Sequence, residues 1–239
     1  MKAIILNGGY ATRLYPLTIN QSKGLLPVRG KPVIEYLVEK LEDIEIVDGI
    51  IVTSNSKFFE DFVKYSKSRQ FKKPIKILDN GSTSNENRLG LGDLTFAIEK
   101  ECIEDDVIVL NGDLYCDFDL RDILKFFEKV RGALVGLYDI GNFEDAKKFG
   151  IIELENDKVK TFEEKPENPK STNIVAGIYL FPKGDLGKIF EYIKTDGPKE
   201  GPAHLIPYLM KKSNVYGFAY KGNWYDIGNL EQYEELNRE

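Results

Sequence analysis

Residue types that often carry chemistry are scarce in this chain of 239 residues, which has two cysteines and a single histidine. Cys102 and Cys116 fit neither a disulfide framework nor a metal-binding pattern, so we expect two reduced thiols without a catalytic role. His204 has no serine or cysteine motif around it. A Ser-His-Asp triad therefore has no support in the sequence.

Long runs of basic residues and long runs of apolar residues are also absent. No basic run stands out and the formal net charge is −6, so we expect no nucleic-acid partner. No apolar stretch is long enough to span a bilayer, and no signal peptide precedes the first expected strand. We therefore expect a soluble cytoplasmic protein with no membrane partner.

The first half of the chain predicts alternating strands and helices. Apolar runs predict buried strands at 2–6, 49–53, 75–78 and 107–110, with helical patterns at 32–41, 58–63 and 94–98 between them. This alternation favours an α/β fold with a mostly parallel, Rossmann-like central sheet flanked by helices. Ligands of such sheets bind beyond the carboxyl ends of the strands.

The second half is richer in β-structure. Apolar runs at 150–154 and 159–162 flank a polar turn, which predicts a β-hairpin. Further strands are expected at 174–181 and 215–220, and helices at 186–193, at 205–210 and from 230. With 42% hydrophobic residues the chain can bury one sizeable core, so we expect a single domain over 1–239.

The most informative stretch is GGYATRLYPLTINQSKGLLPVRGKP, at residues 8–32. Two glycines after a strand can expose backbone N–H groups to one anion, and Arg13 and Lys23 can add positive charge. Such a loop suits a polyphosphate, but it has neither the Walker A spacing nor that of a dinucleotide fingerprint. The residues alone predict a phosphate-binding loop, and a glycine turn with two surface cations stays the alternative.

These residues closely resemble the signature of the sugar-1-phosphate nucleotidyltransferases, the nucleoside-diphosphate-sugar pyrophosphorylases. Two positions depart from the family pattern, since Ala11 replaces a glycine and Ser22 replaces a proline before the lysine. Alanine fits only if its φ is negative, so we expect a negative φ at Ala11. Loss of the proline frees the backbone before Lys23 but leaves its amine available.

The resemblance implies roles for several residues of the first half. Arg13 and Lys23 would be catalytic. The nucleotide would contact residues of the glycine loop and of the long polar loop at 79–92, namely Leu6, Gly8, Gly9, Thr12, Gly81 and Gly90. The nucleotide-binding half would run to about residue 131, and a sugar-binding half would fill about 132–239.

Two aspartates are candidate metal ligands. Asp113 follows an apolar strand, where a carboxylate can hold Mg²⁺ together with substrate phosphates, although a turn aspartate that caps backbone N–H groups is the alternative. The resemblance favours the metal and adds Asp226 of Trp224–Gly228, which looks like a second metal motif. Asp117 and Asp119 form a competing pair, but Asp119 more naturally caps a helix that begins at Leu120.

A charge cluster at 162–166 follows an expected strand. Such clusters are typical of solvated turns, but this one resembles the Glu-Lys-Pro loop of the same family. The resemblance implies that Glu164 contacts sugar hydroxyls and Lys165 the sugar phosphate. Gly150 and Val175 match two further positions of the sugar pocket.

The function implied by the resemblance is Mg²⁺-assisted formation of a nucleoside-diphosphate sugar and pyrophosphate from an NTP and a sugar 1-phosphate. UTP or dTTP and glucose 1-phosphate are the favoured substrates. Because the nucleophile is already an anion, no general base is needed. Two alternatives stay open: a GT-A-type glycosyltransferase, suggested by Asp117-Phe118-Asp119, and a non-catalytic subunit that binds nucleotide sugars. A homo-oligomer is compatible with the sequence.

Overall fold

The computed structural model describes residues 1–84 and 90–238. Leu89, in the long polar loop, lies outside the described residues. The helices are α1 (Val33–Glu42), α2 (Phe59–Ser66), α3 (Gly90–Lys100), α4 (Leu120–Val130), α5 (Phe143–Ala146), α6 (Leu186–Ile193), α7 (Ile206–Met210) and α8 (Leu230–Arg238). Within the described ranges, none of the helices has the length and hydropathy that crossing a membrane requires.

The strands occur in both halves of the chain. They are β1 (Lys2–Asn7), β2 (Pro27–Val28), β3 (Lys31–Pro32), β4 (Ile50–Ser54), β5 (Ile75–Asp79), β6 (Val107–Asn111), β7 (Leu114–Cys116), β8 (Ala133–Asp139), β9 (Gly150–Glu155), β10 (Lys158–Glu164), β11 (Asn173–Phe181), β12 (Val215–Tyr220) and β13 (Trp224–Asp226). Short 3₁₀ turns over Thr12–Leu14 and Lys23–Leu25 carry the two candidate catalytic cations.

The chain divides into two compact units. The first consists of Met1–Ile103, Val109–Asp117 and Asn223–Glu239, and the second of Glu104–Ile108 and Phe118–Gly222. The last segment of the chain, which carries Asp226, thus returns to the first unit. Whether the first unit binds the nucleotide and the second the sugar stays a prediction.

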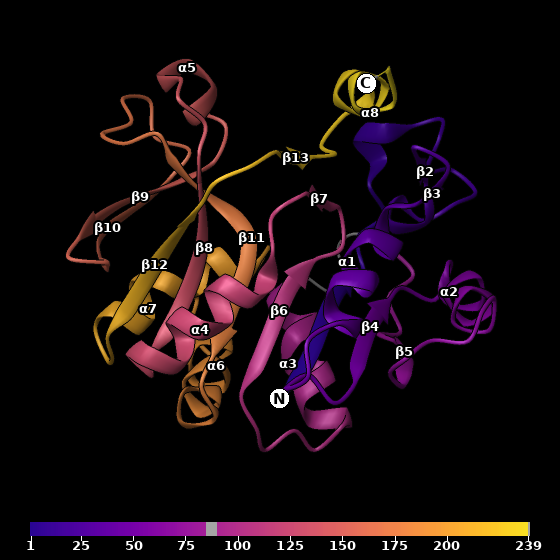
Figure 1. The fold of residues 1–239 in the computed structure, drawn as a ribbon, viewed down its shortest axis with the longest axis horizontal. Coiled ribbons are helices and arrows are strands. Elements are labelled where there is room, and N and C mark those ends of the chain that lie inside the picture. Colours follow the sequence, from indigo (N-terminus) through magenta and orange to yellow (C-terminus); the bar gives the residue numbers. More distant parts are fainter. Residues whose placement is uncertain (85–89, 239) are drawn as a thin grey trace. The chain divides into compact units, whose positions relative to one another are not determined.

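The first unit contains the strand order β5-β4-β1-β6, the order of a Rossmann half. Strand β1 pairs in parallel with β4, and β4 pairs in parallel with β5 (Figure 1). Their register places Asn7, Ser54 and Asp79 side by side at the carboxyl ends. The glycine loop and the long polar loop therefore leave the sheet at one edge.

The second unit has mainly antiparallel pairing, in the order β11-β8-β12-β10-β9. Only β8 and β12 among its pairs of known direction run parallel. The predicted hairpin is confirmed, because β9 and β10 pair directly across a turn at Asn156 and Asp157. The predicted fold class, an α/β protein with a β-rich second half, is confirmed.

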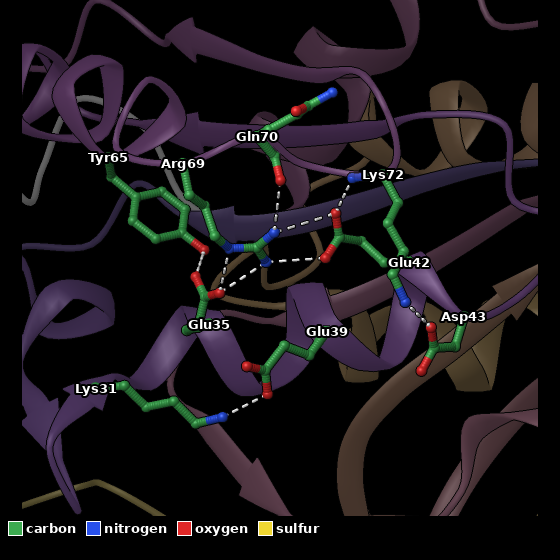
Figure 2. A network of polar contacts seen from close by, with 9 residues as sticks. All are labelled: Lys31, Glu35, Glu39, Glu42, Asp43, Tyr65, Arg69, Gln70 and Lys72. Carbon is green, nitrogen blue, oxygen red and sulfur yellow. Dashed lines mark hydrogen bonds and ion pairs between the residues drawn. The ribbon is translucent and has the colours of Figure 1, made fainter.

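Helix α1 illustrates why the sequence forms these elements. Its apolar residues recur at helical spacing and face the core: Val33, Ile34, Leu37, Val38 and Leu41. Its other side carries Glu35 and Glu42, which the guanidinium of Arg69 joins at 2.7 and 2.8 Å (Figure 2). Tyr65 of α2 donates its hydroxyl to Glu35. This network ties α1 to α2 and to the residues that follow α2.

Candidate active site

The glycine loop begins where β1 ends, and side chains of neighbouring segments hold it. Asn55, directly after β4, donates its amide to the carbonyl oxygens of Gly8 and Gly9 at 3.2 and 3.4 Å. Its Oδ1 accepts from the backbone of Phe58 near the start of α2. A Cβ at Gly8 would lie 2.0 Å from Oδ2 of Asp93, so no larger residue fits there.

The predicted φ of Ala11 is wrong. Ala11 has φ 48° and ψ 46°, the left-handed conformation that glycine adopts easily and alanine does not. Thr18, itself buried, donates its hydroxyl to the carbonyl oxygen of Ala11 at 2.8 Å and braces this turn. The alanine is therefore held in a strained conformation.

This strain predicts that Ala11→Gly stabilises the protein by up to about 1 kcal/mol. Glycine relieves a left-handed cost of roughly 1–2 kcal/mol but adds about 0.4–1 kcal/mol of unfolded-chain entropy. The urea midpoint should rise with an unchanged m-value. The matched control is Ala97→Gly in α3, which should lower the midpoint because that residue is helical. A lower midpoint for Ala11→Gly would contradict the account.

Arg13 lies in the 3₁₀ turn after Ala11 and is exposed. Within residues 1–84 and 90–238 its guanidinium forms no ion pair or side-chain hydrogen bond. The neighbouring Leu14 is buried and anchors the turn. The five N–H donors of Arg13 are therefore available to an anion at the rim of the loop.

Lys23 and Asp113 meet directly, although 90 residues separate them. Nζ of Lys23 lies 2.7 Å from Oδ2 of Asp113, and their side chains are 15% and 34% exposed. Lys23 starts a 3₁₀ turn, and Asp113 lies between β6 and β7. The structure therefore brings together a candidate catalytic cation and a candidate metal ligand within the first unit.

Asp226 approaches the same place from the end of the chain. Strand β13 pairs antiparallel with β7, which sets Asp226 opposite Leu114, the residue after Asp113. The backbone N–H of Ile227 lies 3.5 Å from the carbonyl oxygen of Asp113. The backbones of the two predicted metal ligands thus come close together in the first unit, with Asp226 at the end of β13 and Asp113 directly before β7.

The donor set fits a magnesium ion that shares its coordination with a substrate. Among the described residues no group of three or more His, Cys, Asp or Glu side chains could hold a metal. Mg²⁺ commonly takes one or two carboxylates together with phosphate oxygens and water. Asp113 and Asp226 supply that number and type of ligand.

An apolar cluster in the first unit fixes these segments to one another. It joins the 3₁₀ turn of Arg13, the segment that follows Lys23, β7 and α8. Its buried members are Leu14, Leu26, Val28, Val33, Tyr115, Ile227 and Leu236. Arg29 adds a hydrogen bond to the hydroxyl of Tyr115 at 3.2 Å and one to the carbonyl oxygen of Leu236. The position of the candidate site therefore depends on α8.

The candidate base-binding residues lie on the segment after β5. Gly81 has φ 74°, and among the described residues a Cβ there would meet nothing within 4 Å. Gly90 begins α3, so the long loop expected at 79–92 ends earlier. Asn80 donates to Asp93 at 2.7 Å, and both are buried. No sequence pattern predicts this pair, because its members come from different elements.

The candidate sugar-phosphate residues gather within the second unit. Gly150 pairs with Glu164 across the β9–β10 hairpin. A Cβ at Gly150 would lie 2.9 Å from the ring of Phe162 and 3.0 Å from Oε2 of Glu164, so a larger residue would crowd both side chains. Lys165 has φ 47°, a strained conformation typical of functional loops, and its Nζ lies 3.8 Å from Glu164. Val175 is next to Ile174, which pairs with the residue after Gly150.

The acidic pair that suggested a glycosyltransferase has structural partners. Both carboxylate oxygens of Asp117 accept hydrogen bonds from Asn223, at 2.7 and 2.6 Å. Asp119 is the N-cap of α4, as predicted, and accepts from the backbone of Arg121. These contacts explain both acids without a metal.

Comparison with known proteins identifies relatives over the whole chain. A family model described as nucleotidyl transferase matches residues 2–239. A bifunctional GlmU protein from Methanocaldococcus jannaschii is 35% identical over 243 residues, which cover 100% of this chain and 54% of that protein. The catalytic subunit beta of a Danio rerio mannose-1-phosphate guanylyltransferase is 31% identical, with 98% and 62% covered. The chain thus spans between one half and two thirds of these relatives' length.

Solved structures share the fold. A Bacillus anthracis protein, assigned as a glucose-1-phosphate thymidylyltransferase and solved with sucrose, superposes with a TM-score of 0.84 at 29% identity. The match covers 100% of this chain and 94% of that one. An apo UDP-glucose pyrophosphorylase superposes with a TM-score of 0.81 at 20% identity, over 99% and 96% of the two chains. The second likeness concerns the fold alone.

Proposed function

Because this chain belongs to the nucleotidyl transferase family, we propose that it transfers a nucleotidyl group from an NTP to a sugar 1-phosphate and releases pyrophosphate. The observation that supports the proposal is the ion pair of Lys23 with Asp113 next to the end of β1, together with the backbone proximity of Asp226 to Asp113. A cation and two carboxylates at one place suit a triphosphate with its metal.

In the proposed reaction a phosphate oxygen of the sugar 1-phosphate attacks the α-phosphorus of the NTP in line. The bond from the α-phosphorus to its bridging oxygen breaks, and pyrophosphate leaves with that electron pair. No proton has to be removed from the nucleophile. Catalysis therefore reduces to positioning the reactants and stabilising charge.

Each candidate residue has a role in that scheme. Asp113 and Asp226 would hold Mg²⁺, which neutralises phosphate charge when it is bound. Arg13, exposed and without a partner among the described residues, would bind the β- and γ-phosphates. Lys23 would leave Asp113 to stabilise charge that develops at the α-phosphate. In the second unit Glu164 would contact sugar hydroxyls and Lys165 would contact the sugar phosphate.

The test is pyrophosphate release with Mg²⁺, a sugar 1-phosphate and each NTP in turn. Glucose 1-phosphate with UTP or dTTP is the favoured combination, and the names of the relatives add mannose 1-phosphate and GTP to the panel. We expect release that requires NTP, sugar phosphate and metal together, and that stops with EDTA. The absence of pyrophosphate release with every combination of NTP and sugar 1-phosphate would overturn the proposal.

A glycosyltransferase is the weaker candidate. Its main support was the acidic pair at 117 and 119, and both acids are occupied by Asn223 or by the N-terminus of α4. Transfer from a nucleotide sugar in the absence of NTP would favour it over nucleotidyl transfer.

A further inference from the structure

Asn7 carries a buried polar group that the proposed roles leave unexplained. It ends β1, immediately before the glycine loop, and is 8% exposed. Its amide nitrogen Nδ2 is buried and has no hydrogen-bond partner in the part of the chain that the structure describes. Its backbone N–H, in contrast, lies 3.4 Å from the hydroxyl of Thr53.

The carboxamide lies between the two segments that carry Lys23 and Asp113. A Cβ at Gly24 would lie 2.3 Å from Oδ1 of Asn7, and a Cβ at Gly112 would lie 2.1 Å from Nδ2. Both glycines are therefore required by the presence of the Asn7 side chain. Gly24 directly follows the lysine, and Gly112 directly precedes the aspartate.

An unpaired buried N–H group weakens a fold. Leucine has almost the same shape as asparagine, and at this position it would bury the same volume without leaving a donor unsatisfied. Buried polar groups without partners are rare, and each calls for a reason such as a bound ligand. The polar head of Asn7 is thus better explained by a second, ligand-bound state of the site than by the stability of this one.

The groups around Asn7 indicate the chemical class of that ligand. The neighbouring Lys23 is a cation, and the backbone N–H groups of the glycine loop begin one residue later. Donors and positive charge gathered at one place suit an anion with several oxygens. The ion pair between Lys23 and Asp113 joins the two segments that carry Gly24 and Gly112, so its opening would let these segments move apart around Nδ2.

We propose that Asn7 is a further nucleotide-binding residue, whose side-chain amide donates to a phosphate oxygen of the magnesium-bound NTP. The inference rests on the proposed function and adds to it a donor from the end of β1. The two proposed donors flank the glycines in the sequence. Asn7 precedes Gly8 and Gly9, and Arg13 follows them.

The test compares Asn7→Leu with the wild type in equilibrium binding of the magnesium complexes of UTP, dTTP, GTP, CTP and ATP. Because the variant keeps the shape and loses the donor, its Kd should rise about tenfold, as for one hydrogen bond to a charged group. Its melting temperature should be equal or higher. The matched control is Thr95→Val in α3, another buried polar-to-apolar change of conserved shape. An unchanged Kd in Asn7→Leu would overturn the inference, because the amide would then contribute nothing to NTP binding.

A second measurement uses the wild-type protein and does not depend on the variant folding. The side-chain amide resonances of Asn7, assigned through its own backbone, should shift when a magnesium NTP is added. Unmoved resonances, in a sample where the amides of Gly8 and Gly9 shift, would overturn the inference. A wild type that binds an NTP but releases no pyrophosphate would overturn the proposed function alone. A wild type that binds no NTP would overturn both.

Discussion

Replacing Lys23 by alanine is expected to lower kcat about a hundred- to a thousandfold while the protein stays folded. Loss of one preorganised donor to a developing charge typically costs this much. The stability cost should stay within about 1 kcal/mol, because the partly exposed pair with Asp113 is of the kind that contributes little to folding. Pyrophosphate release under saturating substrates and a urea titration measure the two effects.

The same variant should need less magnesium for half-maximal activity. In the wild type the ammonium group of Lys23 occupies Oδ2 of Asp113, so metal and lysine compete for one carboxylate. The matched control is Lys76→Ala, which removes an ion pair of 2.7 Å with Glu101 and should leave kcat unchanged. Near-wild-type kcat in Lys23→Ala would contradict the assignment of this lysine.

The order of the elements was readable from the sequence because their patterns are local. Apolar runs of four or five residues predicted β1, β4, β5 and β6, and helical spacing predicted α1. Strand β8 at 133–139 was not predicted, although it pairs with both β11 and β12. Its residues form an apolar run of the same kind as those of β4 and β6, so the sequence carried the signal for this strand and the prediction omitted it.

The site shows the same division between local and long-range information. Lys23, Asp113 and Asp226 were predicted as separate motifs. The ion pair of Lys23 with Asp113 spans 90 residues, and Asp226 approaches Asp113 only because β13 pairs with β7. Asn7 was not predicted as a site residue, because an asparagine at the end of a strand is ordinary in a sequence. Only the three-dimensional contacts with Gly24 and Gly112 reveal that its amide is enclosed and unpaired.

Replacing Arg69 by methionine is expected to destabilise the protein by about 3–5 kcal/mol, because it leaves two buried carboxylates without their cation. The side chains of Glu35 and Glu42 are only 11% and 3% exposed, and Arg69 bonds both. Methionine keeps most of the apolar stem, so the loss reports the charge (Figure 2). Urea denaturation at pH 7 measures it. The control Lys64→Met removes an exposed pair with Asp61 and should cost less than about 1 kcal/mol.

The pH dependence of that loss separates charge from packing. Burial alone raises the pKa of Glu42, but hydrogen bonds from Arg69 and from the backbone of Lys72 outweigh it and hold the pKa below 4.5. A lowered pKa gives stability that is present above about pH 4.5 and is lost as the pH falls through the folded-state value. Without Arg69 the burial effect should prevail and raise this pKa above its unfolded value. The variant would then lose stability as the pH rises, so its deficit relative to the wild type should shrink from pH 7 to about pH 5. An equal deficit at both pH values would mean that Arg69 acts through packing instead of charge.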